Sequence, residues 1–286
     1  MNIFSLVDSP DSPIHLSTQN YEKNTAKTWP YVQEINAVTK YFALCPQCQN
    51  PVSLVNPFYQ ITESGLFYAK HVKHDVTGIA PYNEEKYRSC PLHNPVRFDS
   101  QQKREPGSIS NEIKNIFHQH TEVIFRVAEM ISGIDFSYSV KESMMKSFGH
   151  DEGYRYRAIH KFNLPVGFLY MTNGQDIYGC YAKNIEIIKS INKSQNFQAS
   201  DNGYIFRKNK NYKTKLILFF SEHKLPSKQT DNNKETVMLN IAEKTGMGAD
   251  DKKIIHRAPI KYTNDFFHNW IAKKTTLNKL ALQYIK

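Results

Sequence analysis

The chain is poor in cysteine and tryptophan and has no long apolar run. Its 286 residues include only 4 cysteines and 2 tryptophans. So few cysteines exclude a small secreted fold held together by disulfides. No stretch of about 18 apolar residues occurs, so the sequence predicts no helix that spans a membrane. The first residues also lack the basic and apolar segments of a secretory signal, and we therefore expect a cytoplasmic protein.

Several widespread catalytic motifs are absent as well. The sequence contains no Walker A loop, no dinucleotide-binding glycine pattern and no G-x-S-x-G turn. These absences exclude the commonest ATPases, Rossmann enzymes and α/β-hydrolases. The apolar share of 40% and the charged share of 22% are typical of a folded globular chain and not of a disordered one. At this length the chain can form one large domain or two smaller ones, each with its own core.

Positive charge is concentrated in the last part of the sequence. Residues 203–286 contain 17 Lys and Arg against 7 Asp and Glu, which equals the formal net charge of +10 for the whole chain. Residues 1–202 are therefore neutral on balance. A local excess of cations attracts phosphate polymers, because binding releases their condensed counterions. The alternative interpretation is a lysine-rich solvated surface that keeps the protein soluble.

The order of the expected elements indicates an α+β fold. We expect a small zinc-stapled N-terminal module followed by a larger body of helices and antiparallel sheet. An irregular N-terminal arm is expected over 1–39, the zinc-binding module over 40–98, and the α+β body over 108–286. The strongly basic part of that body is the C-terminal third of the chain, residues 203–286.

Apolar periodicity predicts three helices in the body. Apolar residues recur every three or four positions from Ile109 to Ile131, which predicts a long helix ended by Gly133. A shorter helix is expected over 140–148, and another from about residue 263 onward.

Strands are predicted from short apolar runs between turn residues. Asn173-Gly174 separates the apolar runs 166–171 and 177–182, a pattern typical of a β-hairpin. Further strands are expected over 204–206, 216–220 and 237–241.

Two cysteine-containing turns of the same form are the clearest motif. Cys45-Pro46-Gln47-Cys48 and Cys90-Pro91-Leu92-His93 both read Cys-Pro-x-ligand. A gap of two residues lets both side chains of one tight turn reach a single ion, and two such turns complete a Cys3His shell for Zn²⁺. His71 or His74 could take the place of His93 as the fourth ligand. A disulfide between Cys45 and Cys48 is the competing interpretation.

The segment between the two turns resembles a zinc-stapled HNH nuclease over about 50 residues, with a neutral histidine as the base. That family has a histidine at a strand end, an asparagine in the following loop and a zinc knuckle on each side. The resemblance implies His74 as the general base, Asn83 as the residue that holds the loop, and Mg²⁺ or Mn²⁺ as the catalytic ion. The paired residues that begin the family motif are missing, and so is a second metal-binding histidine. We therefore expect no cleavage.

Aromatic and basic residues alternate in two places in the body. In the first, Arg155 and Arg157 are expected either to line a groove for a nucleic-acid backbone or to form the solvent side of a strand. The second set combines rings that can stack on bases with cations that can contact phosphates. Its members are Tyr204, Arg207, Lys208, Lys210, Tyr212, Lys213 and Lys215.

These patterns predict a zinc-stabilised nucleic-acid-binding protein without catalytic activity, which could be one subunit of a larger nucleoprotein complex. The alternatives are an HNH-like metal-dependent endonuclease and a protein-interaction adaptor whose basic surface meets an acidic partner. The residues do not distinguish DNA from RNA, although the mixture of aromatic and basic side chains favours single strands. The signal for a basic amphipathic helix is weak, so we expect no membrane partner.

Overall fold

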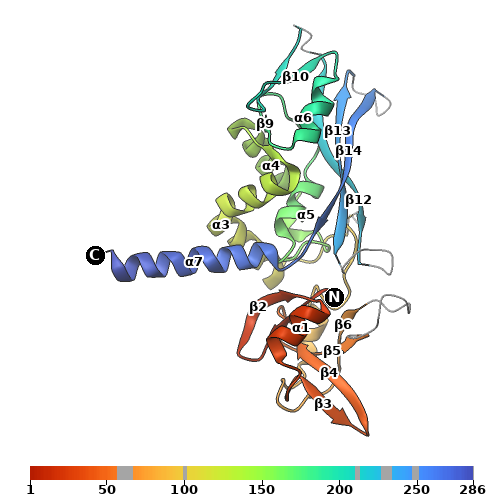
Figure 1. Ribbon diagram of the computed structural model, residues 1–286, viewed down its shortest axis with the longest axis vertical. Helices are drawn as coiled ribbons and strands as arrows, with labels where there is room; N and C mark the ends of the chain where they lie inside the picture. The colour runs from red at the N-terminus through yellow and green to blue at the C-terminus, as the bar shows by residue number, and fades with distance from the viewer. Residues whose placement is uncertain (57–66, 99–101, 210–212, 227–233, 247–250, 286) are drawn as a thin grey trace. The chain divides into compact units, whose positions relative to one another are not determined.

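The computed structural model describes residues 1–56, 67–98, 102–209, 213–226, 234–246 and 251–285 (Figure 1). The chain divides into two units. Unit 1 consists of Met1–Arg97, Lys224–Glu235 and Tyr262–Lys286, and unit 2 consists of Phe98–His223 and Thr236–Lys261. Helices take up 35% and antiparallel sheets 31% of the structure, which confirms the predicted α+β class.

Unit 1 is built on one antiparallel sheet. Its strand order is β2-β1-β4-β5-β6, and β3 also pairs with β4, outside this linear order. The strands are β1 (Ile3–Leu6), β2 (Ser9–His15), β3 (Val32–Ile35), β4 (Val38–Leu44), β5 (Pro51–Val55) and β6 (Tyr68–His71). Helix α1 (Thr18–Thr25) carries the fully buried Tyr21, whose hydroxyl lies within hydrogen-bonding distance of the carbonyl oxygens of Tyr31 and Phe42.

The expectation of an irregular arm over 1–39 is wrong for the local structure. This segment forms three strands and a helix. Pro10 and Pro13 lie in β2 at one edge of the sheet. A proline is tolerated at an edge because its missing N–H need not pair with a neighbouring strand. The polar residue Ser17 caps α1 by accepting a hydrogen bond from the backbone N–H of Asn20.

The three chain segments of unit 1 meet at Glu235, which is buried. Its carboxylate accepts hydrogen bonds from the Tyr262 hydroxyl at 2.8 Å, from Asn2 Nδ2 at 3.4 Å and from Asn264 Nδ2. Burial, with the nearby carboxylate, raises the pKa of Tyr262 well above its ordinary value. Because a buried carboxylate is stable only when it is hydrogen-bonded, these contacts fix where the late segments join the N-terminal sheet.

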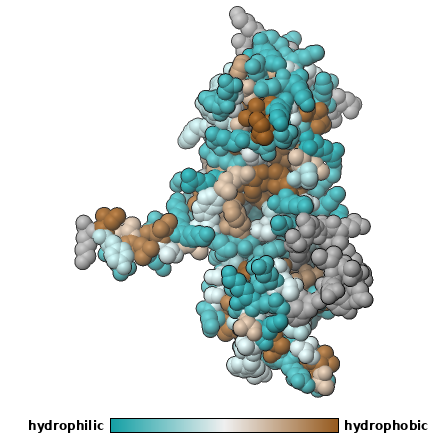
Figure 2. All heavy atoms as spheres, in the orientation of Figure 1, coloured by the Kyte–Doolittle hydropathy of each residue, from teal (hydrophilic) through white to brown (hydrophobic). Residues whose placement is uncertain are grey.

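Two further helices belong to unit 1. They are α2 (Glu84–Ser89) and α7 (Phe266–Tyr284), the second of which matches the helix expected from about residue 263. Along α7 only Phe267 is buried. Leu277, Leu282 and Tyr284 are 65%, 82% and 73% exposed, and Figure 2 shows apolar residues on the surface of this helix.

The helices of unit 2 enclose an aromatic core. The long helix α3 (Ser108–Ser132) and the shorter α4 (Tyr138–His150) confirm the two predictions for this region, and Gly133 ends α3 with a φ of +67°. Phe168 of α5 (Leu164–Met171) has its ring centroid 5.1 Å from that of Phe117 and 5.2 Å from that of Phe148. Edge-to-face ring contacts of this kind add to the free energy of burial.

The predicted hairpin over 166–182 is wrong. Its first run is helix α5, in which Pro165 lies in the first turn and six consecutive residues, Leu164–Leu169, are buried. The second run contributes only the two-residue strand β9 (Tyr181–Ala182). A short, uninterrupted apolar run fits a buried helix as well as a buried strand, and its packing in the core decides which one forms.

The main sheet of unit 2 has the order β14-β13-β12-β8. Its strands are β8 (Gln175–Asp176), β12 (Lys215–Lys224), β13 (Glu235–Lys244) and β14 (Lys252–Tyr262). Figure 1 shows the helices of this unit on one side of β12, β13 and β14. The smaller elements are β7 (Ile134–Asp135), the 3-10 turn η1 (Gly153–Arg155), α6 (Ile185–Asn192), β10 (Phe197–Ala199) and β11 (Ile205–Arg207).

Candidate metal centre

The first cysteine turn connects β4 to β5. Cys45 directly follows β4, and its backbone N–H donates to the carbonyl oxygen of Asn50 at 2.9 Å. The Gln49 N–H donates back to the Cys45 carbonyl oxygen at 2.8 Å, and Gln49 has a φ of +58°. The turn is therefore closed by two backbone hydrogen bonds, and Cys45 and Cys48 are both buried within it.

The other two donors come from β6 and from the end of α2. His71 is the last residue of β6 and is paired in register with Val52 of β5, next to the first turn. Cys90 is the C-cap of α2. The sheet and the short helix thus bring together residues that lie up to 45 positions apart in the sequence.

Four side chains form one buried cluster: Cys45, Cys48, His71 and Cys90. Their ligand atoms all lie within 4.8 Å of one another. The Cys45 and Cys90 sulfurs are 3.7 Å apart, and the Cys48 sulfur is 3.3 Å from His71 Nε2. A tetrahedral zinc shell requires about 3.8 Å between two sulfurs and about 3.6 Å between a sulfur and a nitrogen. All four cysteines of the chain are free thiols, so no disulfide competes for these donors.

The three thiols differ in acidity. Burial raises the pKa of Cys45 far above its ordinary value, and hydrogen bonds with Cys48 and Cys90 add to the shift. At Cys90 the hydrogen bond with Cys45 lowers the pKa. The interaction with Cys48 and burial outweigh this effect, and together they raise the pKa of Cys90 to about 12. Hydrogen bonds from Cys45 and Cys90 hold the pKa of Cys48 well below its ordinary value. These directions predict a thiolate at Cys48 and thiols at Cys45 and Cys90 in the metal-free centre, and a bound cation would displace the two thiol protons.

Asn50 connects the two halves of the centre. It is 1% exposed, and its Nδ2 lies 3.5 Å from the Cys48 sulfur. The same amide pairs with the backbone of Asn83, the residue that caps α2. Polar contacts of this kind around a metal site orient the ligands and keep the site formed.

His93, the first choice for the fourth ligand from the sequence, lies beside the cluster and outside it. Its Nε2 is hydrogen-bonded to the Tyr87 hydroxyl, and its ring centroid is 5.9 Å from that of His71. His93 is exposed, whereas His71 is 8% exposed. The geometry favours His71, which the sequence offered as an alternative. The matching Cys-Pro-x-ligand spacing favoured His93 in the sequence. The position of His71 becomes visible only when β6 is paired with β5.

The residues of the HNH resemblance have other roles in the structure. Asn83 is the N-cap of α2, and its Oδ1 accepts a hydrogen bond from the Lys86 N–H at 2.9 Å. Asp75 accepts a hydrogen bond from the Tyr82 N–H. His74 is exposed and lines a groove over β4 and β5. Among the described residues, His74 is hydrogen-bonded neither to Asn83 nor to the adjacent Asp75.

Arg155 and Arg157 do not alternate along a strand. Arg155 ends the 3-10 turn η1, and its guanidinium donates to the Glu152 carboxylate at 2.7 Å and to the Arg104 carbonyl oxygen at 3.1 Å. Arg157 is exposed. Only Arg157 of this pair therefore has its side chain largely in solvent.

Part of the second basic set is engaged within unit 2. Arg207 donates to the Thr214 carbonyl oxygen, and its guanidinium lies 4.9 Å from the centre of the Tyr178 ring. Lys208 Nζ donates to the Ser194 carbonyl oxygen at 2.6 Å, just after α6. Lys213 and Lys215 are exposed, and Tyr204 is half-buried with its ring centroid 5.2 Å from that of Tyr181. Lys210 and Tyr212 lie outside the described residues.

Comparisons of the chain with protein-family models, with curated proteins and with solved structures give no match in any of the three. No helix in the described part of the chain combines the length and the apolar character needed to cross a membrane.

Proposed function

We propose that this protein binds nucleic acid, performs no catalysis, and depends for its fold on one zinc ion. The metal part of the proposal is supported by four buried donors whose ligand atoms all lie within 4.8 Å of one another, close enough to share one ion. Three thiolates and one imidazole suit Zn²⁺ better than harder ions such as Mg²⁺ or Ca²⁺. Four protein ligands leave no open coordination position, so the ion would be structural. It would hold the β4–β5 turn against the end of α2.

The observation that carries the nucleic-acid part is the charge of β14. This strand of 11 residues lies at one edge of the main sheet of unit 2 and contains no Asp or Glu. Four cationic side chains along it are exposed: Lys252, Lys253, Arg257 and Lys261. Arg257 also pairs with Glu222 of β12. Cations gathered on one exposed edge strand can contact the phosphates of a nucleic-acid backbone.

The test is the salt dependence of binding to labelled single- and double-stranded DNA and RNA. Each phosphate contact on a single strand contributes about 0.7 to the slope of log affinity against log salt. Replacing the four β14 cations together by glutamine should therefore lower the slope by up to about 3 and weaken binding at low salt. Fluorescence polarisation measures both quantities.

A matched control removes the same number of charges from unit 2. The control variant replaces four lysines that are exposed or half-buried and that each pair with a carboxylate: Lys141, Lys146, Lys183 and Lys189. Their replacement by glutamine should leave the slope close to that of the wild type. An equal change in both variants would show a general effect of net charge, and absence of binding to every nucleic acid would favour the adaptor alternative.

A further inference from the structure

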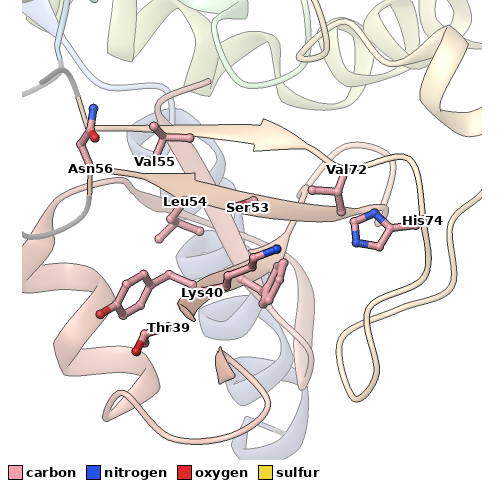
Figure 3. Close-up of a pocket in the computed structure, with 10 residues that line it drawn as sticks. Thr39, Lys40, Ser53, Leu54, Val55, Asn56, Val72 and His74 are labelled. Atoms are coloured by element: carbon pink, nitrogen blue, oxygen red, sulfur yellow. The ribbon is translucent and has the colours of Figure 1, made fainter. Parts of the chain in front are cut away.

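A groove in unit 1, separate from the metal cluster, lies over β4 and β5 (Figure 3). Its volume is about 550 Å³, within the range of sites that bind small molecules. The walls come from residues 39–42 on β4, residues 53–56 on and after β5, and Val72 and His74 after β6. The groove therefore has a sheet as its base and a loop as one wall.

The base of the groove is apolar, and its rim carries hydrogen-bond donors. Val55 and Val72 are half-buried and offer the apolar surface that a ligand can reach, whereas Phe42 and Leu54 are only 2% and 5% exposed. The polar lining residues are Thr39, Lys40, Tyr41, Ser53, Asn56 and His74, and neither Asp nor Glu is among the lining residues. A ligand with an apolar part and a negatively charged part would match both surfaces.

Two basic side chains face the same part of the groove. Figure 3 shows the His74 ring and the Lys40 side chain pointing into the space beside Ser53. Among the described residues, Lys40 and His74 have no ion pair and no side-chain hydrogen bond. An ammonium and an imidazole that converge without a carboxylate between them can both donate hydrogen bonds to an anion in the intervening space.

The strand register adds a second lysine to this face of the sheet. Phe42 pairs with Ser53, and Ser53 pairs with Lys70 of β6. Directly paired residues on neighbouring strands project on the same face. Lys70 is exposed, so positive charge extends along this face from Lys40 on β4 to β6.

We propose that this groove binds a nucleotide, with the phosphate between Lys40 and His74 and the base and sugar against the apolar surface of Val55 and Val72. A phosphate group accepts hydrogen bonds from ammonium, imidazole and hydroxyl groups at once, and Ser53 supplies the hydroxyl. The same chemistry has two sources: a free mononucleotide, or one unit of a bound strand. The second source rests on the proposed nucleic-acid-binding function, and the first does not.

The experiment is calorimetric titration of the full chain with adenosine 5′-monophosphate, adenosine and inorganic phosphate, together with polarisation measurements on a labelled single-stranded oligonucleotide. The test variant is Lys40→Gln with His74→Gln. The matched control is Lys23→Gln with His150→Gln, which changes the same residue types at two exposed positions that do not line the groove. Metal content and circular dichroism check that each variant is folded.

We expect the mononucleotide to bind at least tenfold more tightly than adenosine or phosphate, and the test variant to lose at least tenfold in that affinity while the control does not. Equal binding of phosphate and mononucleotide would overturn the assignment, because it would indicate an adventitious anion site only. Equal mononucleotide affinity in the two variants would also overturn it.

The oligonucleotide measurement distinguishes a free mononucleotide from one unit of a bound strand as the ligand. It also distinguishes failure of the groove assignment from failure of the proposed nucleic-acid-binding function. Weaker oligonucleotide binding in the test variant alone supports a groove that holds one unit of a strand. Unchanged oligonucleotide binding with weakened mononucleotide binding supports a site for the free nucleotide. If the oligonucleotide binds equally to all forms and the mononucleotide to none, the groove assignment fails and the proposed function stands. If the oligonucleotide does not bind the wild type, the proposed function fails and the mononucleotide result alone decides the groove.

Discussion

The Asn50 side chain pairs with the backbone of Asn83 through two hydrogen bonds. Asn50 Oδ1 accepts from the Asn83 N–H at 2.6 Å, and Asn50 Nδ2 donates to the Asn83 carbonyl oxygen at 3.0 Å. The two residues are separated by 33 positions, and one follows the Cys45–Cys48 turn while the other begins the helix that ends at Cys90. This pair therefore holds the two halves of the cysteine cluster together independently of any ion.

Replacing Asn50 by Ala should weaken the metal site without removing a ligand. The change removes two hydrogen bonds to the Asn83 backbone, each worth about 0.5–1.5 kcal/mol, so it should lower the free energy of unfolding by about 1–3 kcal/mol. It should also lower zinc affinity by about 10–100-fold, as is usual for residues that orient ligands. Chelator competition and urea unfolding measure the two effects. The control is Asn24→Ala, which removes an exposed hydrogen bond to the Asn20 carbonyl oxygen within α1. It should change neither the zinc affinity nor the free energy of unfolding appreciably.

The choice between His71 and His93 can be made with two single substitutions. His71→Ala should reduce zinc affinity by more than the roughly 10–100-fold expected for a residue that only orients a ligand. His93→Ala should keep one zinc per chain, because its ring contacts Tyr87 and lies outside the cluster. Zinc content after dialysis against a weak chelator gives the answer. Loss of zinc in His93→Ala with retention in His71→Ala would reverse the assignment.

Zinc binding should release about two protons per ion near pH 7. The raised pKa values of Cys45 and Cys90, the latter at about 12, mean that both groups are protonated thiols in the metal-free protein at this pH. The lowered pKa of Cys48 means that it is already a thiolate. Since protons compete with the metal, the affinity should fall as the pH falls, by about a hundredfold per pH unit. Calorimetry in buffers of different ionisation enthalpy counts the protons, and a count near zero would contradict the expected thiol states.

No cleavage of DNA or RNA is expected with Mg²⁺ or Mn²⁺. The sequence lacks the paired residues that begin the HNH motif and a second metal-binding histidine, and in the structure Asn83 caps α2 while His74 lines a groove. His74→Ala should leave zinc content unchanged and should shift the free energy of unfolding by no more than about 0.5 kcal/mol, since this side chain is exposed. Gel assays on single- and double-stranded substrates provide the measurement. Divalent-ion-dependent cutting that disappears in His74→Ala would establish the nuclease alternative instead.

Local patterns in the sequence predicted the features that depend on local physics. The helix α3 follows from its apolar spacing and the terminal Gly133, and Cys45 and Cys48 follow from the two-residue gap within one turn. Cys90 was predicted as a third ligand because its turn has the same Cys-Pro-x-ligand form. These features are determined within a few residues of chain, where spacing alone carries the information.

Features determined by tertiary packing escaped the sequence reasoning. His71 enters the cluster through the pairing of β6 with β5, which residue spacing does not show. The Leu164–Met171 run became a helix because it is surrounded by the aromatic core. Arg207 and Lys208 were predicted as phosphate contacts, yet carbonyl oxygens close to them in the fold accept their hydrogen bonds. The cationic edge strand β14 emerged only once the strand order was known.

X-ray absorption at the zinc K edge tests the central claim most directly. The protein reconstituted with Zn²⁺ and then freed of excess ion should contain one zinc per chain. Its spectrum should fit three sulfur ligands at about 2.3 Å and one nitrogen ligand at about 2.0 Å. Substoichiometric zinc, or a shell dominated by oxygen ligands, would contradict a Cys3His site formed by Cys45, Cys48, His71 and Cys90.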